Sequence, residues 1–135
     1  MTMTERQYSV DYDPGKRIIR LALVGQWDVE TLHAYEQAIT DTIAPLGGAG
    51  GLRKDLGFLV DKRNQGVQSK IVAEGLGAMI LGGKDLKLPC AILLSLSALQ
   101  KLQQQRVTAS LSNTAIFTDE AKALAWLASE QSKAM

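Results

Sequence analysis

Short apolar segments alternate with segments of helical periodicity along most of this 135-residue chain, and this alternation restricts the fold more than any other feature. Apolar segments of strand length lie at residues 56–60, 90–94 and 114–117, and each is followed by a stretch with one apolar helical face. Parallel strands need a crossover connection, usually a helix, to bring the chain back to the same edge of the sheet. The sequence therefore predicts an α/β fold with a mostly parallel sheet.

The first two strands are expected to form a hairpin. Residues 8–12 alternate in character, and residues 17–24 are rich in β-branched and apolar side chains. Between them, Asp13-Pro14-Gly15 favours a turn, because proline presets φ and glycine accepts a positive φ. The hairpin makes the sheet mixed, with about five strands in all.

About four helices are expected, largely on one side of the sheet. Asp28 is a good N-cap for the first helix and Thr118 for the last, where Asp119 and Glu120 favour the positive helix end. The predicted ranges are about 28–44, 69–81, 98–111 and a final helix that begins after Thr118. This order predicts one α/β domain over residues 7–128, followed by a frayed tail at 129–135.

Composition excludes several functional classes. The 15 Lys and Arg residues are balanced by 14 Asp and Glu residues, so the chain lacks the basic field of a nucleic-acid-binding protein. A single Cys and a single His disfavour a disulfide framework and a zinc site. The sequence contains neither an apolar run of membrane-spanning length nor a signal-peptide pattern, so a cytoplasmic protein is expected.

No motif of nucleophilic, metal-dependent or phosphate-loop chemistry is found, so no catalytic residue, metal or cofactor is assigned. The glycine-rich stretch at 46–52 follows a helix rather than a strand, and it is interpreted as a flexible linker. His33 is interpreted as an exposed or half-buried helix residue, and Cys90 as an inert buried thiol. Trp27 and Trp126 are predicted to anchor the core.

The best polar cluster in the sequence follows the strand at 56–60. Asp61 is expected at the carboxyl end of that strand, where open α/β sheets bind their ligands, and Arg63 follows in a turn-like stretch over residues 62–66. Two interpretations stay open. The pair forms either a salt bridge within a loop or a contact with a ligand or partner.

Three segments together resemble STAS domains, the fold of bacterial sporulation anti-sigma-factor antagonists. They are LGFLVD at 56–61, AEGLGAMIL at 73–81, and the ending at 90–127, whose last part reads FTDEAKALAWL. This ending is most similar to the SpoIIAA-like branch, and the resemblance covers residues 7–128. It implies a bacterial, non-enzymatic regulatory module whose partner is a kinase or a sigma regulator.

The sequence departs from that family at the phosphorylation site. Typical antagonists carry Asp-Ser-Ser-Gly-Leu-Gly at the start of the second helix, and a kinase phosphorylates the serine before the first glycine. Here Glu74 precedes Gly75, so the usual acceptor is missing. Ser69 offers a nearby hydroxyl but is expected to cap the helix. The candidates for contact with a partner or ligand are Asp61, Arg63, Ser69, Glu74 and Gly75.

An alternative function is a small carrier. The SpoIIAA-like branch is related to lipid-carrier folds that hold apolar ligands under a mobile helix. Residues 72–81 are apolar, and the glycines that flank and interrupt them could act as hinges. A second helix that lifts could expose an apolar groove or contact a membrane surface. The sequence therefore leaves two hypotheses, a protein-interaction module or a carrier of an apolar ligand, and in either case a homodimer is plausible.

Overall fold

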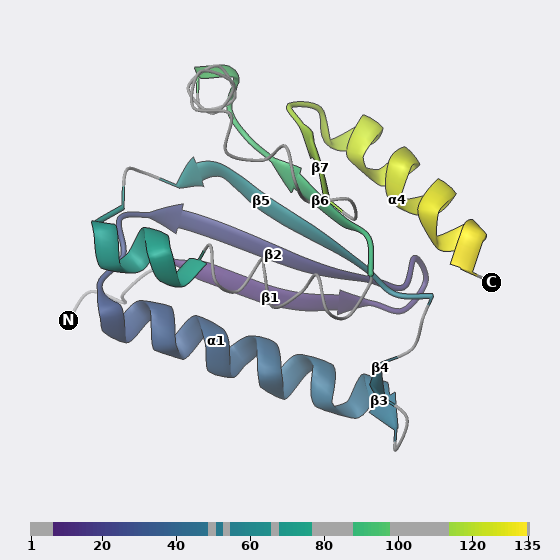
Figure 1. The fold of residues 1–135 in the computed structure, drawn as a ribbon, viewed down its shortest axis with the longest axis horizontal. Coiled ribbons are helices and arrows are strands. Elements are labelled where there is room, and N and C mark those ends of the chain that lie inside the picture. Colours follow the sequence, from purple (N-terminus) through teal and green to yellow (C-terminus); the bar gives the residue numbers. More distant parts are fainter. Residues whose placement is uncertain are drawn as a thin grey trace.

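A computed structural model of the protein describes residues 7–48, 51–52, 55–65, 68–76, 88–97 and 114–134. Its centre is a five-stranded sheet with the strand order β1-β2-β5-β6-β7 (Figure 1). The strands are β1 (Tyr8–Asp13), β2 (Ile18–Gly25), β5 (Gly57–Gln65), β6 (Cys90–Leu93) and β7 (Thr114–Phe117). Strand β1 is antiparallel to β2, and the remaining three pairs of neighbouring strands in this sheet are parallel. This confirms the predicted opening hairpin and mostly parallel sheet.

The helices cover both faces of the sheet. Helix α1 (Val29–Ile43) and the helical residues 70–76 pack on one face, and α4 (Glu120–Ala134) packs on the other, over β5, β6 and β7 (Figure 1). The described part of the chain thus holds three α-helical segments longer than one turn, one fewer than predicted. The predicted helix at 98–111 lies outside the described residues.

Two apolar clusters follow from the two-residue period of the strands. On the α1 side, Ile19, Leu21 and Leu23 of β2 are buried against helix residues that include Leu32 and Val72. The α4-side cluster is smaller. Its buried residues are Ile18, Leu59, Ala91, Leu93, Ala123 and Leu127. Strand β6 contributes to both clusters, which confirms that this apolar segment is buried on both faces.

The predicted turn forms, but the residue with a positive φ is Arg17 and not Gly15 as expected. The Asp13 Oδ1 atom accepts hydrogen bonds from the backbone N–H groups of Gly15 and Lys16, at 2.9 and 3.2 Å. Arg17 then adopts a φ of 56°, a left-handed conformation that is rare for residues other than glycine. The backbone is therefore locally strained at Arg17, where the turn meets β2.

Helix α1 begins as the sequence predicts. Asp28 caps it by accepting a hydrogen bond from the Thr31 N–H at 2.7 Å. Trp27 is buried between Tyr8 and Tyr35 in edge-to-face contacts, so its predicted role as a core anchor is confirmed. His33 is exposed on α1.

The glycine-rich stretch is more regular than a flexible linker. A 3-10 turn, η1 (Ala44–Leu46), ends α1, and the short strands β3 (Gly47–Gly48) and β4 (Gly51–Leu52) then pair in an antiparallel way. Strand pairing needs only backbone groups, so glycines can form it without side-chain packing.

The prediction for β5 was too short. The strand continues through the expected turn to Gln65, so Asp61 lies within it rather than after it. Beyond the Ala22–Asp61 pair, one extra residue in β5 forms a bulge that shifts the register, so that Asn64 and Gln65 pair with Val24 and Gly25. Pairing with β6, by contrast, ends at Asp61, opposite Leu93.

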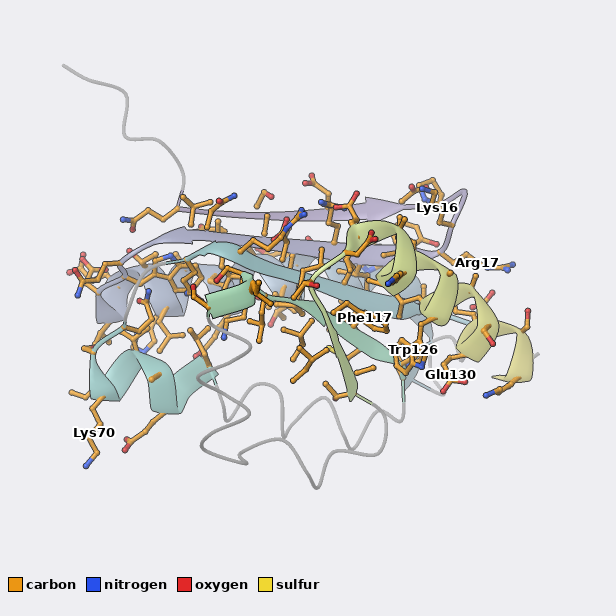
Figure 2. The ribbon with its side chains drawn as sticks, turned by 90° about the horizontal axis from the view of Figure 1, so that it is seen from above. Lys16, Arg17, Lys70, Phe117, Trp126 and Glu130 are labelled. Carbon is orange, nitrogen blue, oxygen red and sulfur yellow. The ribbon has the colours of Figure 1, made fainter. Side chains whose placement is uncertain are left out.

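Helix α4 begins and ends later than expected. Its cap is Asp119, whose Oδ1 atom accepts from the Ala121 N–H at 2.8 Å, and not Thr118. The helix continues to Ala134 through residues expected to fray, and Gln131 within it is only 5% exposed. Trp126 packs on Phe117 at the edge of this face, with ring centroids 5.9 Å apart (Figure 2). Within the described ranges, no helix has both the length and the apolar composition needed to cross a bilayer.

Candidate functional site

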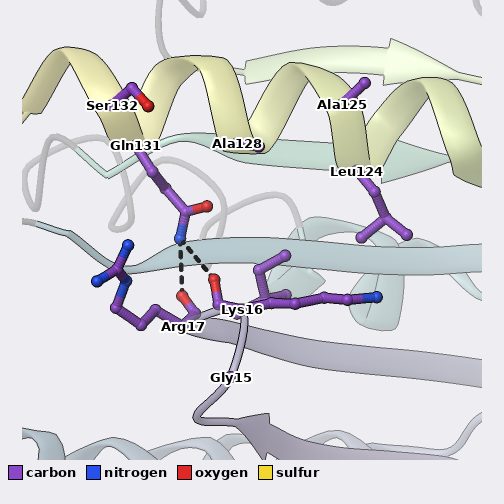
Figure 3. Close-up of a pocket in the computed structure, with 9 residues that line it drawn as sticks. Gly15, Lys16, Arg17, Leu124, Ala125, Ala128, Gln131 and Ser132 are labelled. Carbon is purple, nitrogen blue, oxygen red and sulfur yellow. Dashed lines mark hydrogen bonds between the residues drawn. The ribbon is translucent and has the colours of Figure 1, made fainter.

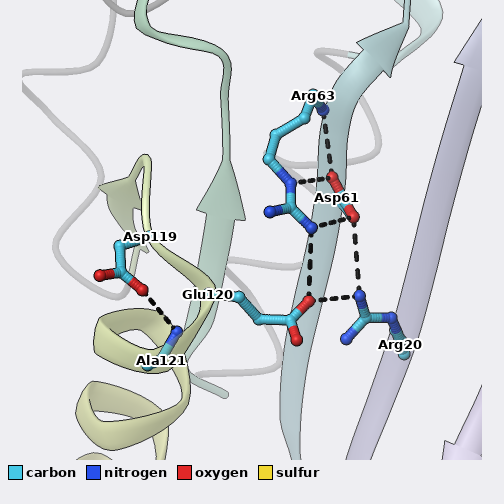
Figure 4. A network of polar contacts seen from close by, with 6 residues as sticks. All are labelled: Arg20, Asp61, Arg63, Asp119, Glu120 and Ala121. Atoms are coloured by element: carbon cyan, nitrogen blue, oxygen red, sulfur yellow. Dashed lines mark hydrogen bonds and ion pairs between the residues drawn. The ribbon is translucent and has the colours of Figure 1, made fainter.

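Asp61 and Arg63 form a close ion pair on the α4 side of β5. The Arg63 Nε and Nη2 atoms donate to Asp61 Oδ1 and Oδ2 at 3.0 and 2.8 Å, and the Arg63 backbone N–H donates to Oδ1 at 3.1 Å (Figure 4). The two side chains meet because residues two apart on a strand share a face. The predicted polar pair is therefore present, but it lies on a strand and not in a loop.

Arg20 and Glu120 extend this pair into a four-residue network. The Arg20 Nη2 atom lies 2.5 Å from Glu120 Oε1 and 3.6 Å from Asp61 Oδ2, and Arg63 Nη2 lies 3.4 Å from the same Glu120 oxygen. The network joins β2 and β5 to the first turn of α4, and its two cations balance its two carboxylates (Figure 4). We call these four residues the charge network.

Burial and hydrogen bonding shift the pKa values of Asp61 and Arg63 within the charge network. Asp61 is 8% exposed, and the hydrogen bonds from Arg63 hold the pKa of its carboxyl below the ordinary value. The same contacts raise the pKa of Arg63. On the opposite face, burial lowers the pKa of Lys62, a half-buried residue.

Ser69, Glu74 and Gly75 lie on the α1 side of the sheet, away from the charge network. The Ser69 Oγ atom accepts from the Val72 N–H at 3.4 Å, and the Ser69 carbonyl accepts from Ala73 N–H at 2.9 Å, as expected of a cap. Glu74 is exposed to solvent. The five candidate residues are therefore divided between the two faces of the sheet, and they do not form a single pocket.

Gly75 is a packing residue. An added Cβ atom would overlap the Cδ2 atom of Leu32, so this position brings residues 70–76 into close contact with α1. Val72 and Leu76 on the same segment are buried in the α1-side cluster. Gln68 fixes the segment at its start, since its Oε1 accepts from Trp27 N–H and its Nε2 donates to the Gly25 carbonyl, both at 2.8 Å.

Apolar side chains are exposed at one edge of the sheet. Among the described residues, the large hydrophobic side chains with the greatest exposure are Val24 at 44%, Val29 at 40%, Ile71 at 64% and Leu96 at 64%. Val24 lies near the end of β2 and Leu96 follows β6, whereas Val29 begins α1 after β2 and Ile71 is on the helical residues 70–76 after β5; parallel strands bring their carboxyl ends to one end of the sheet. We call these four residues the apolar rim. Lys70 projects into solvent next to Ile71 (Figure 2).

Sequence reasoning missed Arg20, Glu120 and Gln68. Arg20 interrupts the apolar segment of β2, which signals a polar role on the α4 side, but nothing local connects it with Glu120, 100 residues later. Gln68 precedes the helix in a polar stretch that resembles an ordinary loop. In the described part of the chain, no group of three or more His, Cys, Asp or Glu residues could hold a metal ion.

Comparison with known proteins establishes the fold. Neither a protein-family model nor a curated protein sequence matches the chain. A solved structure does match, that of an uncharacterised protein of the DUF3478 family from Shewanella loihica PV-4, which has a SpoIIAA-like fold. The TM-score is 0.66 at 15% identity, and the match covers 94% of this chain and 98% of the other. The SpoIIAA-like fold that the sequence resemblance implies is thereby confirmed.

Proposed function

We propose that this chain with a SpoIIAA-like fold is a non-enzymatic regulatory module that binds a protein partner through the apolar rim. The proposal combines the fold with the position of the exposed apolar side chains. As the resemblance to anti-sigma-factor antagonists implies, the partner is a kinase or a sigma regulator.

The apolar rim is the observation that carries this proposal. Single exposed apolar side chains are ordinary on protein surfaces, but these four follow or end parallel strands, where open α/β sheets bind their ligands. Ile71 and Leu96 are each about two-thirds exposed and follow adjacent strands of the sheet. Burial of such a side chain against a partner contributes about 1.5–3 kcal/mol, so two or three anchors suffice for a regulatory complex.

The surroundings of Ile71 favour a protein as the occupant. Lys70 and Glu74 are exposed beside it, so the apolar centre has neighbours of both charge signs. Protein–protein interfaces usually have an apolar centre that is surrounded by polar and charged residues. A lipid surface that carries anionic headgroups would favour a cluster of basic residues instead.

Glu74 makes the interaction independent of phosphorylation at that position. A carboxylate supplies a permanent negative charge where typical antagonists gain one from a kinase, although with fewer acceptor oxygens than a phosphate. Ser69 keeps its structural role as a cap. The complex is then expected to form without a phosphorylation cycle at position 74.

Asp61 supports the site without contacting the partner. Its carboxylate is almost fully buried, accepts hydrogen bonds from Arg63 and forms an ion pair with Arg20. Arg63 and Glu120 have side chains that are more than a third exposed, but they lie on the α4 side, away from the segment that carries Ile71.

Site-specific photo-crosslinking tests this proposal. A benzoylphenylalanine at position 71 is expected to trap one dominant protein partner in cells, whereas the same group in place of Ser129 of α4, which is also exposed, is expected to trap none. Equal trapping at both positions would contradict the proposal. Crosslinking to a second copy of the chain would show that the apolar rim forms a homodimer instead of binding a different protein.

The carrier hypothesis has its own measurement. Native mass spectrometry after gentle purification is expected to give the mass of the chain alone. A co-purified fatty acid or lipid at stoichiometric amounts would overturn the interaction module and favour the carrier.

A further inference from the structure

A pocket of 440 Å³ lies between the β1–β2 turn and α4 (Figure 3). It is formed at the amino end of β2, whereas the apolar rim lies at the carboxyl ends of the strands, so the two sites are separate. Its volume falls within the range of small-molecule sites, roughly 300–1,000 Å³. What it binds is decided by the side chains that line it.

Gln131 gives the pocket a fixed hydrogen-bond acceptor. Its Nε2 atom donates to the backbone carbonyls of Lys16, Arg17 and Asp55, at 3.1, 2.9 and 2.9 Å. Because three carbonyls surround the nitrogen, the orientation of the carboxamide is determined. The Oε1 atom points away from these carbonyls and makes no hydrogen bond within the described residues (Figure 3). A ligand with an N–H or O–H group would satisfy it.

The wall on the α4 side is apolar and made of small residues. Ala125 and Ala128 line the pocket one helical turn apart, with Leu124 beside them. Alanine leaves space where a longer side chain would fill the pocket. This wall accommodates a small apolar body of the ligand.

Charge at the pocket favours an anion. Both charged residues of the lining, Lys16 and Arg17, are cationic. The Arg17 guanidinium already pairs with Asp55 at 3.5 Å. The ammonium of Lys16 is exposed, and no described carboxylate pairs with it. Lys16 is therefore the cation that a ligand carboxylate would reach.

We propose that this pocket binds a small carboxylic acid that carries an N–H or O–H donor on a compact apolar body. The carboxylate pairs with Lys16, the donor bonds to Gln131 Oε1, and the apolar body packs on Ala125 and Ala128. Ligand binding at this pocket does not depend on the apolar rim, so a negative result for the protein partner would leave this proposal unaffected.

Titration with indole-3-acetate, followed by 1H–15N NMR, tests the site. This probe has a carboxylate, a ring N–H and an apolar ring, and at its size a Kd on the order of 1 mM is expected. Shifts are expected at the Gln131 side-chain amide and at the backbone amides of Ala125 and Ala128. The analogue 1-methylindole-3-acetate has no donor and is expected to bind about fivefold more weakly.

Two variants and a matched control complete the test. Ala128→Leu fills the pocket from an exposed helix position and is expected to abolish binding, whereas Ser129→Leu adds the same side chain at an exposed position outside the pocket and is expected to retain it. Lys16→Ala is expected to weaken binding about fivefold. The absence of shifts at these residues up to about 10 mM probe, where a Kd near 1 mM gives close to full occupancy, or unchanged binding by Ala128→Leu, would overturn the proposal.

Discussion

Arg63 donates to both carboxylate oxygens of Asp61, although only one residue separates the two in the sequence. The alternation of β5 directs both side chains to the α4 side, where Arg20 of the neighbouring strand and Glu120 of α4 complete the charge network. A strongly polar pair in the middle of a parallel strand thus becomes an attachment point for the first turn of a helix.

Replacement of Asp61 by Asn is expected to lower the free energy of unfolding by about 2 kcal/mol at pH 7, because Arg63 and Arg20 lose a charged, nearly buried acceptor. Since the pKa of Asp61 is lowered in the folded state, its contribution is present above the unfolded value near 4 and is lost as pH falls through the folded value. Urea unfolding at several pH values measures this.

The same series has an internal control. Asp11→Asn on β1 changes an exposed carboxylate and is expected to have an effect within about 0.5 kcal/mol. If the difference between the wild type and the Asp61→Asn variant stays constant from pH 7 to below 4, the ion pair does not contribute as described.

Gly75→Ala is expected to destabilise the protein by about 1–3 kcal/mol, despite the better helix propensity of alanine, because the new Cβ would overlap Leu32. Thermal unfolding of this variant and of the double variant with Leu32→Val measures the effect. The shorter side chain should recover part of the loss, so the two changes should not be additive. A stabilising or fully additive result would refute the close contact.

Gln131→Leu is expected to cost about 2 kcal/mol or more, because the backbone carbonyls of Lys16, Arg17 and Asp55 each lose a hydrogen bond from this buried side chain. Ser132→Ala, one residue later and exposed, is expected to be nearly neutral. Chemical denaturation compares the two variants. Equal stabilities would mean that the end of α4 frays in solution.

Cys90 is expected to react slowly with thiol reagents. Burial raises the pKa of its thiol to about 12, so at pH 8 the thiolate fraction is roughly a thousandfold below that of an unfolded cysteine. Colour development with a disulfide reagent should therefore be slow in buffer and immediate in guanidinium. Rapid reaction of the folded protein would show that the thiol is accessible.

The architecture could be predicted because hydrophobic periodicity and turn chemistry act locally. The strand at Cys90–Leu93, the Asp28 cap and the turn after Asp13 all carry their signals within a few residues. The extension of β5 was missed since residues 62–65 are polar, and only pairing with β2 beyond the bulge makes them a strand. A local sequence pattern cannot show that β2 lies beside these residues and pairs with them.

The candidate sites depended more on tertiary contacts. Asp61 and Arg63 were found by sequence, but Glu120 joins them only because α4 starts above β5. Gln131 had a signal that went unused, since it continues the buried helical stripe of Ala123 and Leu127 at spacings of four residues. The apolar rim could not be read from sequence, because exposure is a property of the folded chain.

The most direct test of the proposed interaction measures the affinity of the partner trapped at position 71 for purified variants. Ile71→Glu introduces a charge at the centre of the apolar rim and is expected to weaken binding at least tenfold, while Ser129→Glu, which places the same charge on exposed α4, should leave the affinity within about twofold. Both variants should fold, because both positions are exposed. Equal affinities for the two variants would contradict a docking site at the carboxyl edge of the sheet.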